Sequence, residues 1–200
     1  MDALSHRIVK GEYDVKENSE PQLLAFFKPL KDKGLSPKSC TVDGNPQVIR
    51  VLRQLWPGII IQRCLVHVQR QGLMWCRQKP RRTDAKALRR FFRWVTVIET
   101  KAEQDQFLKR LLSWEQRYGP RIAEREEKGR VFSDLKRARS MLLKALPDMF
   151  HYLDNPSIPS TTNGLEGYFS HLKRHYRNHR GLRPEKRGHY FKWYFFLRPK

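Results

Sequence analysis

The chain has 200 residues, of which 41 are Lys or Arg and 20 are Asp or Glu, so its formal net charge at pH 7 is +21. With 39% hydrophobic and 12% aromatic residues it has the material for a hydrophobic core, which argues against disorder of the whole chain. So large a positive excess favours a polyanionic partner, nucleic acid before an anionic membrane surface, over a purely metabolic substrate.

The cysteines and the apolar runs narrow the class of protein further. Cys40, Cys64 and Cys76 are three in number and have no disulfide-framework spacing, which argues against a secreted, disulfide-stapled domain. The longest apolar runs, such as Gly58–Ile61, are far too short to span a membrane. We therefore expect a soluble protein of a reducing cytoplasm, with no membrane partner.

Strand and helix patterns alternate through the first 80 residues. In chain order they predict a strand within Ser5–Tyr13, a helix over Glu20–Lys33, a strand over Ser39–Asp43, a helix over Asn45–Leu55, a strand over Ile59–Ile61 and a helix over Leu65–Gln78. This alternation predicts an α/β sheet. Because the run Ile59–Ile61 is apolar on both faces, we expect it to be a central parallel strand.

The rest of the chain is predicted to be mainly helical. From Thr83 to Phe150 only charged sequence of helical period occurs, and a turn-rich linker follows over Leu153–Ser160. Thr161–Asn163 then caps a helix that runs through Tyr176, and the aromatic tail Lys186–Leu197 fits a helix or a strand. We expect three segments: an α/β core over residues 1–80, an all-helical insertion over 81–150 and a C-terminal part of the core over 151–200.

Asp43 ends a predicted strand and is followed by Gly44. An acid at the C-terminal end of a sheet strand lies at the edge where α/β proteins usually bind ligands, and a glycine beside it lets backbone or phosphate approach closely. An ordinary Asp-Gly turn explains the same pair equally well.

The helix that follows Thr161 carries one acid, Glu166, at the head of a basic stripe. Its apolar residues should face the core: Leu165, Tyr168, Phe169, Leu172 and Tyr176. On the neighbouring face Glu166 is followed by Ser170, Lys173, Arg177 and Arg180. Glu166 either complements the helix dipole or is a metal-binding carboxylate with cations behind it for a phosphate backbone. Paired with Asp43 it would hold Mg²⁺, or Mn²⁺, for phosphodiester cleavage.

Two groups of histidines and cysteines have a structural and a metal-binding interpretation. Cys64 and His67 form a Cys-x-x-His pair, which we interpret as structural rather than as half of a zinc site because no second pair follows at zinc-finger spacing. His171, His175 and His179 recur at every fourth position of one helix. Among so many cations they are more simply phosphate-facing groups than a metal ladder.

The basic residues form four clusters: Arg77–Arg82, Arg89–Arg90, Lys136–Arg139 and Lys173–Arg187. A single such cluster is usually a solvated surface, but four in one chain favour nucleic-acid binding. In the last cluster we expect five residues to contact DNA: Lys173, Arg174, Arg177, Arg180 and Arg183.

Two segments resemble a known family when they are taken together. TVDGNPQVIRVLRQLWPGIIIQRCLVHVQRQ and STTNGLEGYFSHLKRHYRNHRGL, separated by a helical insertion, resemble the RNase H-like transposases of bacterial insertion sequences, in particular the Mutator-like group. The resemblance implies an RNase H-like mixed sheet, with Asp43 as the second and Glu166 as the third acid of an Asp-Asp-Glu triad. Cys64 and His67 would be the family's structural string.

The resemblance also implies a reaction and its partners. The reaction would be metal-dependent hydrolysis at transposon ends, followed by transfer of the freed 3′-hydroxyl into target DNA, at the nucleoid of a bacterial cytoplasm. The partners would be transposon ends and target DNA, and the resemblance leaves room for a homo-oligomer.

The chain departs from the family at the first acid of the triad. Only Asp2 and Asp14 are early aspartates, and neither follows an apolar strand. We therefore expect an N-terminally truncated sheet, the C-terminal portion of a transposase that does not catalyse the reaction alone. The alternative is a non-enzymatic, basic nucleic-acid-binding protein in which both acids are structural; a zinc-binding regulator is a third interpretation.

Overall fold

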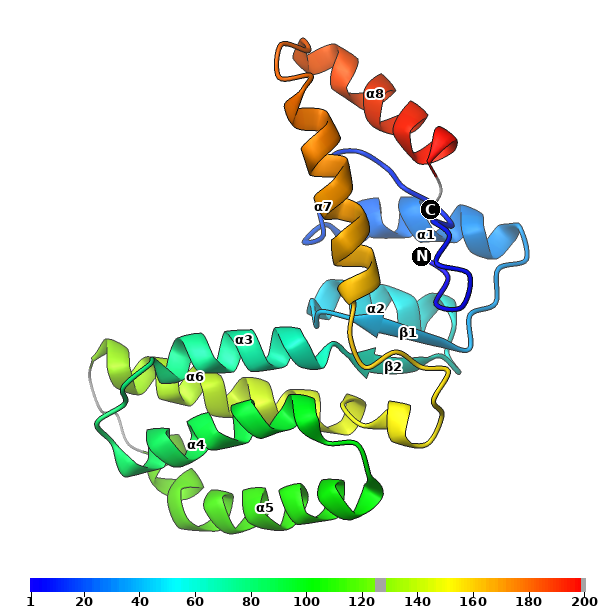
Figure 1. The fold of residues 1–200 in the computed structure, drawn as a ribbon. Helices are drawn as coiled ribbons and strands as arrows, with labels where there is room; N and C mark the ends of the chain where they lie inside the picture. The colour runs from blue at the N-terminus through cyan, green and yellow to red at the C-terminus, as the bar shows by residue number, and fades with distance from the viewer. Residues whose placement is uncertain (125–128, 199–200) are drawn as a thin grey trace. The chain divides into compact units, whose positions relative to one another are not determined.

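The computed structural model describes residues 1–124 and 129–198 (Figure 1). The strands are β1 (Ser39–Val42) and β2 (Ile60–Arg63). The helices are α1 (Glu20–Asp32), α2 (Pro46–Leu55), α3 (Leu65–Cys76), α4 (Thr83–Trp94), α5 (Lys101–Glu124), α6 (Arg130–Ala145), α7 (Asn163–Arg177) and α8 (Pro184–Leu197). Short 3-10 turns lie at Val95–Val97, Leu146–Asp148 and His151–Leu153.

The chain forms two compact units. The first, which we call the sheet unit, comprises Met1–Ile61 and Ser157–Lys200. The second, the helical unit, comprises Gln62–Pro156. None of the described helices combines the length and the apolar composition that a membrane-spanning segment requires.

In the sheet unit, β1 and β2 pair and α2 connects them. Asn45 caps the N-terminus of α2: its side-chain oxygen accepts hydrogen bonds from the backbone N–H groups of Gln47 (2.9 Å) and Val48 (3.3 Å), which the helix leaves without an internal partner. The apolar faces of α1 and α2 enclose one core: Leu23, Val42, Val51, Leu52, Leu55, Trp56, Ile59 and Ile61. Val42, the last residue of β1, lies in this core, which therefore holds the end of the strand that precedes Asp43.

The predicted α/β class is confirmed, but the described chain is mostly helical and its sheet has two strands. The prediction of a central strand buried on both faces is wrong. Ile61 is buried with the core under α2, whereas the side chain of Ile60 is 39% exposed. An apolar run of three residues does not reveal which of its side chains the sheet will cover.

The predicted strand within Ser5–Tyr13 is wrong as well, because this segment is bent. The backbone N–H of Ser5 donates to the Asp2 carboxylate (2.7 Å), and His6 has a φ of 55°. Further along, the ring of Tyr13 stacks on that of Phe191 in α8, with centroids 4.7 Å apart. Packing against α8 therefore replaces pairing in a sheet.

Helices α7 and α8 are joined by a short turn and pack through aromatic rings. The ring centroids of Tyr176 and Phe191 are 5.0 Å apart, and those of Tyr168 and Phe195 are 6.3 Å apart. The aromatic tail is thus a helix, one of the two forms that the sequence allowed. On α7, Tyr168 and Leu172 are buried as predicted, but Phe169 is 38% exposed because it lies at the edge of the stripe.

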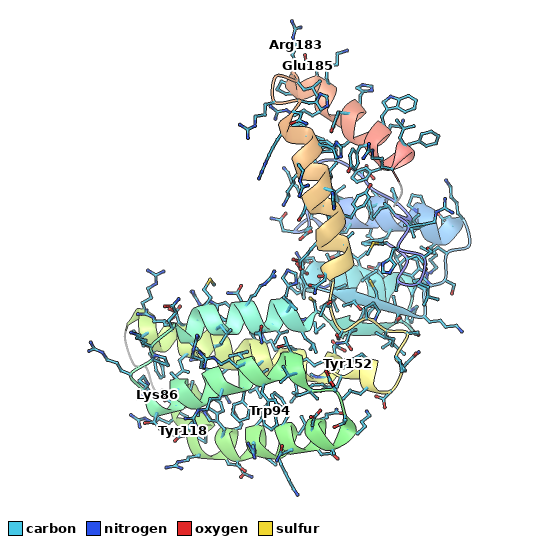
Figure 2. All side chains as sticks on the ribbon, in the orientation of Figure 1. Lys86, Trp94, Tyr118, Tyr152, Arg183 and Glu185 are labelled. Atoms are coloured by element: carbon cyan, nitrogen blue, oxygen red, sulfur yellow. The ribbon has the colours of Figure 1, made fainter. Side chains whose placement is uncertain are left out.

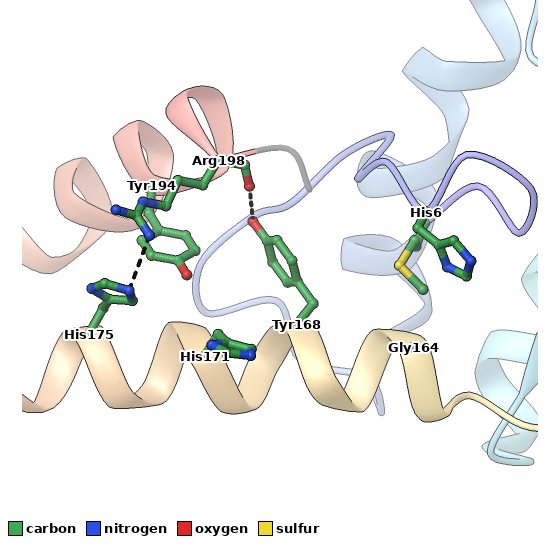
Figure 3. A pocket seen from close by; sticks show the side chains of 8 residues that line it. His6, Gly164, Tyr168, His171, His175, Tyr194 and Arg198 are labelled. Atoms are coloured by element: carbon green, nitrogen blue, oxygen red, sulfur yellow. Dashed lines mark hydrogen bonds between the residues drawn. The ribbon is translucent and has the colours of Figure 1, made fainter.

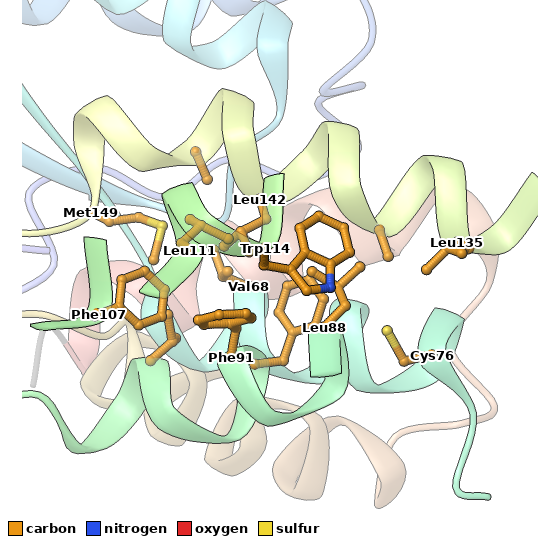
Figure 4. Close-up of a cluster of buried hydrophobic side chains, with 14 of the residues drawn as sticks. Val68, Cys76, Leu88, Phe91, Phe107, Leu111, Trp114, Leu135, Leu142 and Met149 are labelled. Atoms are coloured by element: carbon orange, nitrogen blue, oxygen red, sulfur yellow. The ribbon is translucent and has the colours of Figure 1, made fainter. Parts of the chain in front are cut away.

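The helical unit packs α3, α4, α5 and α6 around a second core, part of which Figure 4 shows. The ring of Phe107 in α5 meets the rings of Phe91 and Phe150 edge to face, at centroid distances of 5.6 and 5.7 Å. Gly72 brings α3 against α4, since a Cβ at this position would lie 2.2 Å from the ring of Phe92. Helix α3, which we grouped with residues 1–80, shares this core with the insertion.

Polar contacts complete the helical unit. Gln62, which has no exposed surface, donates to the carbonyl of Met149 (2.7 Å) and accepts from the N–H of Tyr152 (3.3 Å). Figure 2 marks Tyr152, whose hydroxyl donates to the carbonyl of Ile98 (2.6 Å). These bonds tie the end of β2 to the segment that follows α6.

Candidate functional site

Asp43 lies directly after β1 and is exposed. One carboxylate oxygen, Oδ1, accepts the backbone N–H of Asn45 at 3.0 Å. Between them Gly44 has a φ of +106°, a backbone conformation that residues with a side chain rarely adopt. The Asp-Gly pair therefore forms a tight turn that turns the chain from β1 into α2 and presents an acid at the end of the strand.

Glu166 is the fourth residue of α7 and is half-buried. Its carboxylate accepts a long hydrogen bond of 3.4 Å from the hydroxyl of Thr162, the residue that precedes the helix. Ser170, one turn later, donates its hydroxyl to the Glu166 backbone carbonyl (2.8 Å). An acid in the first turn complements the helix dipole, so the position suits both the structural and the metal-binding interpretation.

A hydrogen bond links the two chain segments that carry these acids. The hydroxyl of Thr41 in β1 donates to the carbonyl of Pro159, at 2.6 Å, across 118 residues of sequence. Thr41 comes two residues before Asp43, and Pro159 comes seven residues before Glu166. The sheet unit thus places the end of β1 beside the segment that leads into α7.

Cys64 and His67 lie in the helical unit at the start of α3. Cys64 is the fully buried residue just before the helix, and His67 is a half-buried residue of its first turn. The Cys64 sulfur and a ring nitrogen of His67 lie within 4.8 Å of one another. Burial of Cys64 beside the first turn of α3 fits the structural role that the sequence suggested for this string.

All five residues predicted to contact DNA are exposed: Lys173, Arg174, Arg177, Arg180 and Arg183. The first three lie on α7, Arg180 lies in the turn that follows, and Arg183 immediately precedes α8. Figure 2 shows Arg183 at the end of this helical hairpin, next to Glu185. The buried positions of α7 are Tyr168 and Leu172, so the cations extend from the opposite side of the helix.

A cavity of about 420 Å³ in the sheet unit was not foreseen from the sequence. It lies between α7, α8 and the first residues of the chain (Figure 3). Most of its lining is aromatic or cationic: His6, Tyr168, His171, His175, Tyr194 and Arg198. Of the residues that line this cavity, only the regularly spaced histidines of α7 stood out in the sequence. Tyr194 and Arg198 come from a tail that the sequence allowed to be either a helix or a strand.

Comparison with protein families shows to which family the chain belongs. The model of the family "Transposase, Mutator family" matches residues 6–186. The chain belongs to the Mutator family of transposases. This match covers both compact units and confirms the family resemblance of the segments around Asp43 and Glu166. Searches of curated proteins and of solved structures gave no match.

Proposed function

We propose that this Mutator-family transposase chain supplies part of a site for metal-dependent DNA strand cleavage and strand transfer in transposition, with Asp43 and Glu166 as its carboxylates. The observation that carries the proposal is the bond from Thr41 to Pro159, because it ties together the two segments that bear the acids. The elements β1, α2, β2 and α7 would then belong to the C-terminal part of a domain with an RNase H-like mixed sheet. Helices α3–α6 would be the helical insertion of that domain.

The two acids fit the metal that this chemistry requires. Both offer hard oxygen ligands, the type that Mg²⁺ and Mn²⁺ prefer. The carboxylate of Asp43 is exposed after a strand, and that of Glu166 is half-buried in the first turn of a helix, so neither is enclosed in the hydrophobic core. Asp43 and Glu166 would hold the ions, which would supply a more acidic bound water and stabilisation of the leaving oxygen of a phosphodiester.

The basic residues of α7 supply the binding of DNA in this proposal. Helix α7 carries Glu166 in its first turn and three cations after it: Lys173, Arg174 and Arg177. The cations that would hold the phosphate backbone therefore lie on the same helix as the acid. Each phosphate contact releases counterions, which makes the affinity for DNA fall with salt. Transposon ends and target DNA are the expected substrates.

We further propose that these 200 residues bind DNA but do not cleave it by themselves. The triad needs a third acid, and neither Asp2 nor Asp14 lies on a strand of the described sheet. The test incubates the purified chain with supercoiled plasmid DNA and Mn²⁺ and follows the nicked form. We expect retarded but intact plasmid; nicking that the Asp43→Asn substitution abolishes would contradict this proposal.

One observation favours the alternative, a DNA-binding protein without an active site. Asp43 accepts a hydrogen bond from the N–H of Asn45 in the turn after β1, and Glu166 accepts one from the hydroxyl of Thr162 at the start of α7. Each acid therefore stabilises the local structure around it. In this alternative Asp43→Asn and Glu166→Gln change stability but not metal binding. The two proposals are therefore separated by measuring both quantities on the same variants.

A further inference from the structure

The aromatic rings that line the cavity of the sheet unit contact one another. Tyr168, which is 8% exposed, is fixed by its hydroxyl, which donates to the backbone carbonyl of Arg198 at 2.8 Å. The ring of Tyr194 lies 6.0 Å from that of Tyr168 at an angle of 73°, and 5.8 Å from the imidazole of His175. Rings that hold one another in place lose little freedom when a flat ligand stacks on them.

Polar groups lie among these rings (Figure 3). The guanidinium of Arg198 approaches the Nε2 atom of His175 at 3.2 Å. A guanidinium only donates, so Nε2 can take part in this contact only as the acceptor. His6 and the exposed His171 add ring nitrogens to the lining. The cavity thus combines flat apolar faces with donors and acceptors that can meet the edge of a ligand.

The lining fits some ligands poorly. A transition-metal ion would need its ligand atoms close together, and within the described chain the three histidines of the cavity do not bring their nitrogens within 4.8 Å of one another. A purely aliphatic ligand would make no hydrogen bonds with Arg198 or with the histidines of the lining. A lone phosphate would occupy little of the 420 Å³ and would not use the aromatic faces.

A planar heterocycle uses all of these features. The volume lies within the range of about 300–1,000 Å³ that small-molecule sites have. Unpaired bases are bound by stacking on aromatic side chains and by hydrogen bonds to their edges, next to cations that follow the backbone. Such cations are present, because Arg174 follows His171 by three positions and precedes His175 by one on the same helix, and is exposed.

We propose that this cavity binds an unpaired nucleobase of the DNA substrate, with Tyr168 and Tyr194 as stacking surfaces and Arg198 at the edge of the base. The inference rests on the proposed function, since it takes DNA as the ligand. It adds a site at which the protein distinguishes distorted or single-stranded DNA from a regular duplex.

The test compares two fluorescent DNA hairpins of equal sequence, one fully paired and one with a single bulged adenine. Binding of the full chain is measured by anisotropy at fixed salt. We expect at least about fivefold tighter binding of the bulged hairpin, the lower end of what one aromatic stack contributes. The Tyr194→Leu substitution should reduce this preference to near unity and leave the affinity for the paired hairpin unchanged.

Two further variants show whether a loss of the preference comes from the cavity itself rather than from misfolding or from the loss of any aromatic residue. His171→Ala changes an exposed position of α7, so it should fold normally and still lower the preference. Trp193→Leu changes a neighbouring aromatic residue of α8 that is 60% exposed and does not line the cavity, so the preference should persist.

The outcomes separate this inference from the proposed function. Equal affinities for the two hairpins, or a preference that survives both Tyr194→Leu and His171→Ala, would overturn the base-binding site while DNA remains the ligand. Absence of binding to either hairpin would overturn both the site and the proposed function.

Discussion

The hydroxyl of Thr41 donates a 2.6 Å hydrogen bond to the carbonyl of Pro159, which joins β1 to the segment that enters α7. Each of these segments leads to one acid of the proposed site, Asp43 or Glu166. Since the two segments are 118 residues apart in sequence, this contact is what a fold must supply before both acids can serve one ion.

Removing the Thr41 hydroxyl should weaken this junction. Thr41→Val keeps the shape of the side chain but leaves the Pro159 carbonyl without this donor, so we expect a loss of about 1 kcal/mol in the free energy of unfolding, and weaker Mn²⁺ binding. Thr96→Val is the control, because Thr96 accepts a hydrogen bond from Gln69 inside the helical unit. It should cost similar stability in urea denaturation and leave Mn²⁺ binding unchanged; equal effects of both variants on Mn²⁺ would refute the role of Thr41.

The cations of α7 should set the salt dependence of DNA binding. For Arg174→Gln and Arg177→Gln we expect the slope of log K against log salt concentration to become shallower by about 0.9 each, the effect of one phosphate contact on duplex DNA. Arg117→Gln removes the same charge from an exposed position of α5 and should leave the slope unchanged. The slopes are measured by anisotropy between about 50 and 200 mM salt. If all three variants and the wild type gave the same slope, the DNA would not contact these cations of α7.

The contact between α3 and α4 should tolerate no added atom. A Cβ at Gly72 would lie within 2.2–2.3 Å of the Phe92 ring, so Gly72→Ala should lower the free energy of unfolding by about 1–3 kcal/mol through overpacking. Gly58→Ala places its methyl group where nothing lies within 4 Å. Its urea midpoint should match that of the wild type, and a stable Gly72→Ala variant would show that the two helices lie further apart than described.

Alkaline pH should destabilise the fold. Burial raises the pKa of Cys76 to about 12, an effect that nearby Arg89 opposes, and burial with the charges of Glu103 and Glu99 raises that of Tyr152 to about 12. A raised pKa in the folded state means that stability is complete below the unfolded values of 9.0 and 10.0 and is lost as pH rises toward 12.

The urea midpoint at several pH values tests this dependence. It should be nearly constant from about pH 7 to 9 and then fall. Tyr152→Phe should lower the midpoint at neutral pH, because the hydroxyl bonds the carbonyl of Ile98, yet show a smaller further loss above pH 10.0. A midpoint that rises with pH in this range would contradict the assignment.

Local sequence signals predicted most of the helices and the two strands, since capping residues such as Asn45 and apolar periodicity act within one element. The signals failed where distant contacts decide. The segment after Ser5 alternates like a strand, but Tyr13 stacks on Phe191 of α8 instead. The sequence likewise indicated Asp43 and Glu166 as candidates without showing the Thr41 bond that links their segments, and the cavity around Tyr194 needed the packing of α7 on α8.

The central claim is that Asp43 and Glu166 hold the same metal ion, and a double-mutant cycle on Mn²⁺ binding tests it most directly. Titration calorimetry would compare the wild type with Asp43→Asn, Glu166→Gln and the double variant, and with Glu185→Gln as a control for loss of an exposed acid from α8. The account predicts that each single substitution weakens Mn²⁺ binding at least about tenfold, and that their effects are not additive because they remove ligands of one ion. Unchanged binding in both single variants, or strictly additive losses, would contradict it.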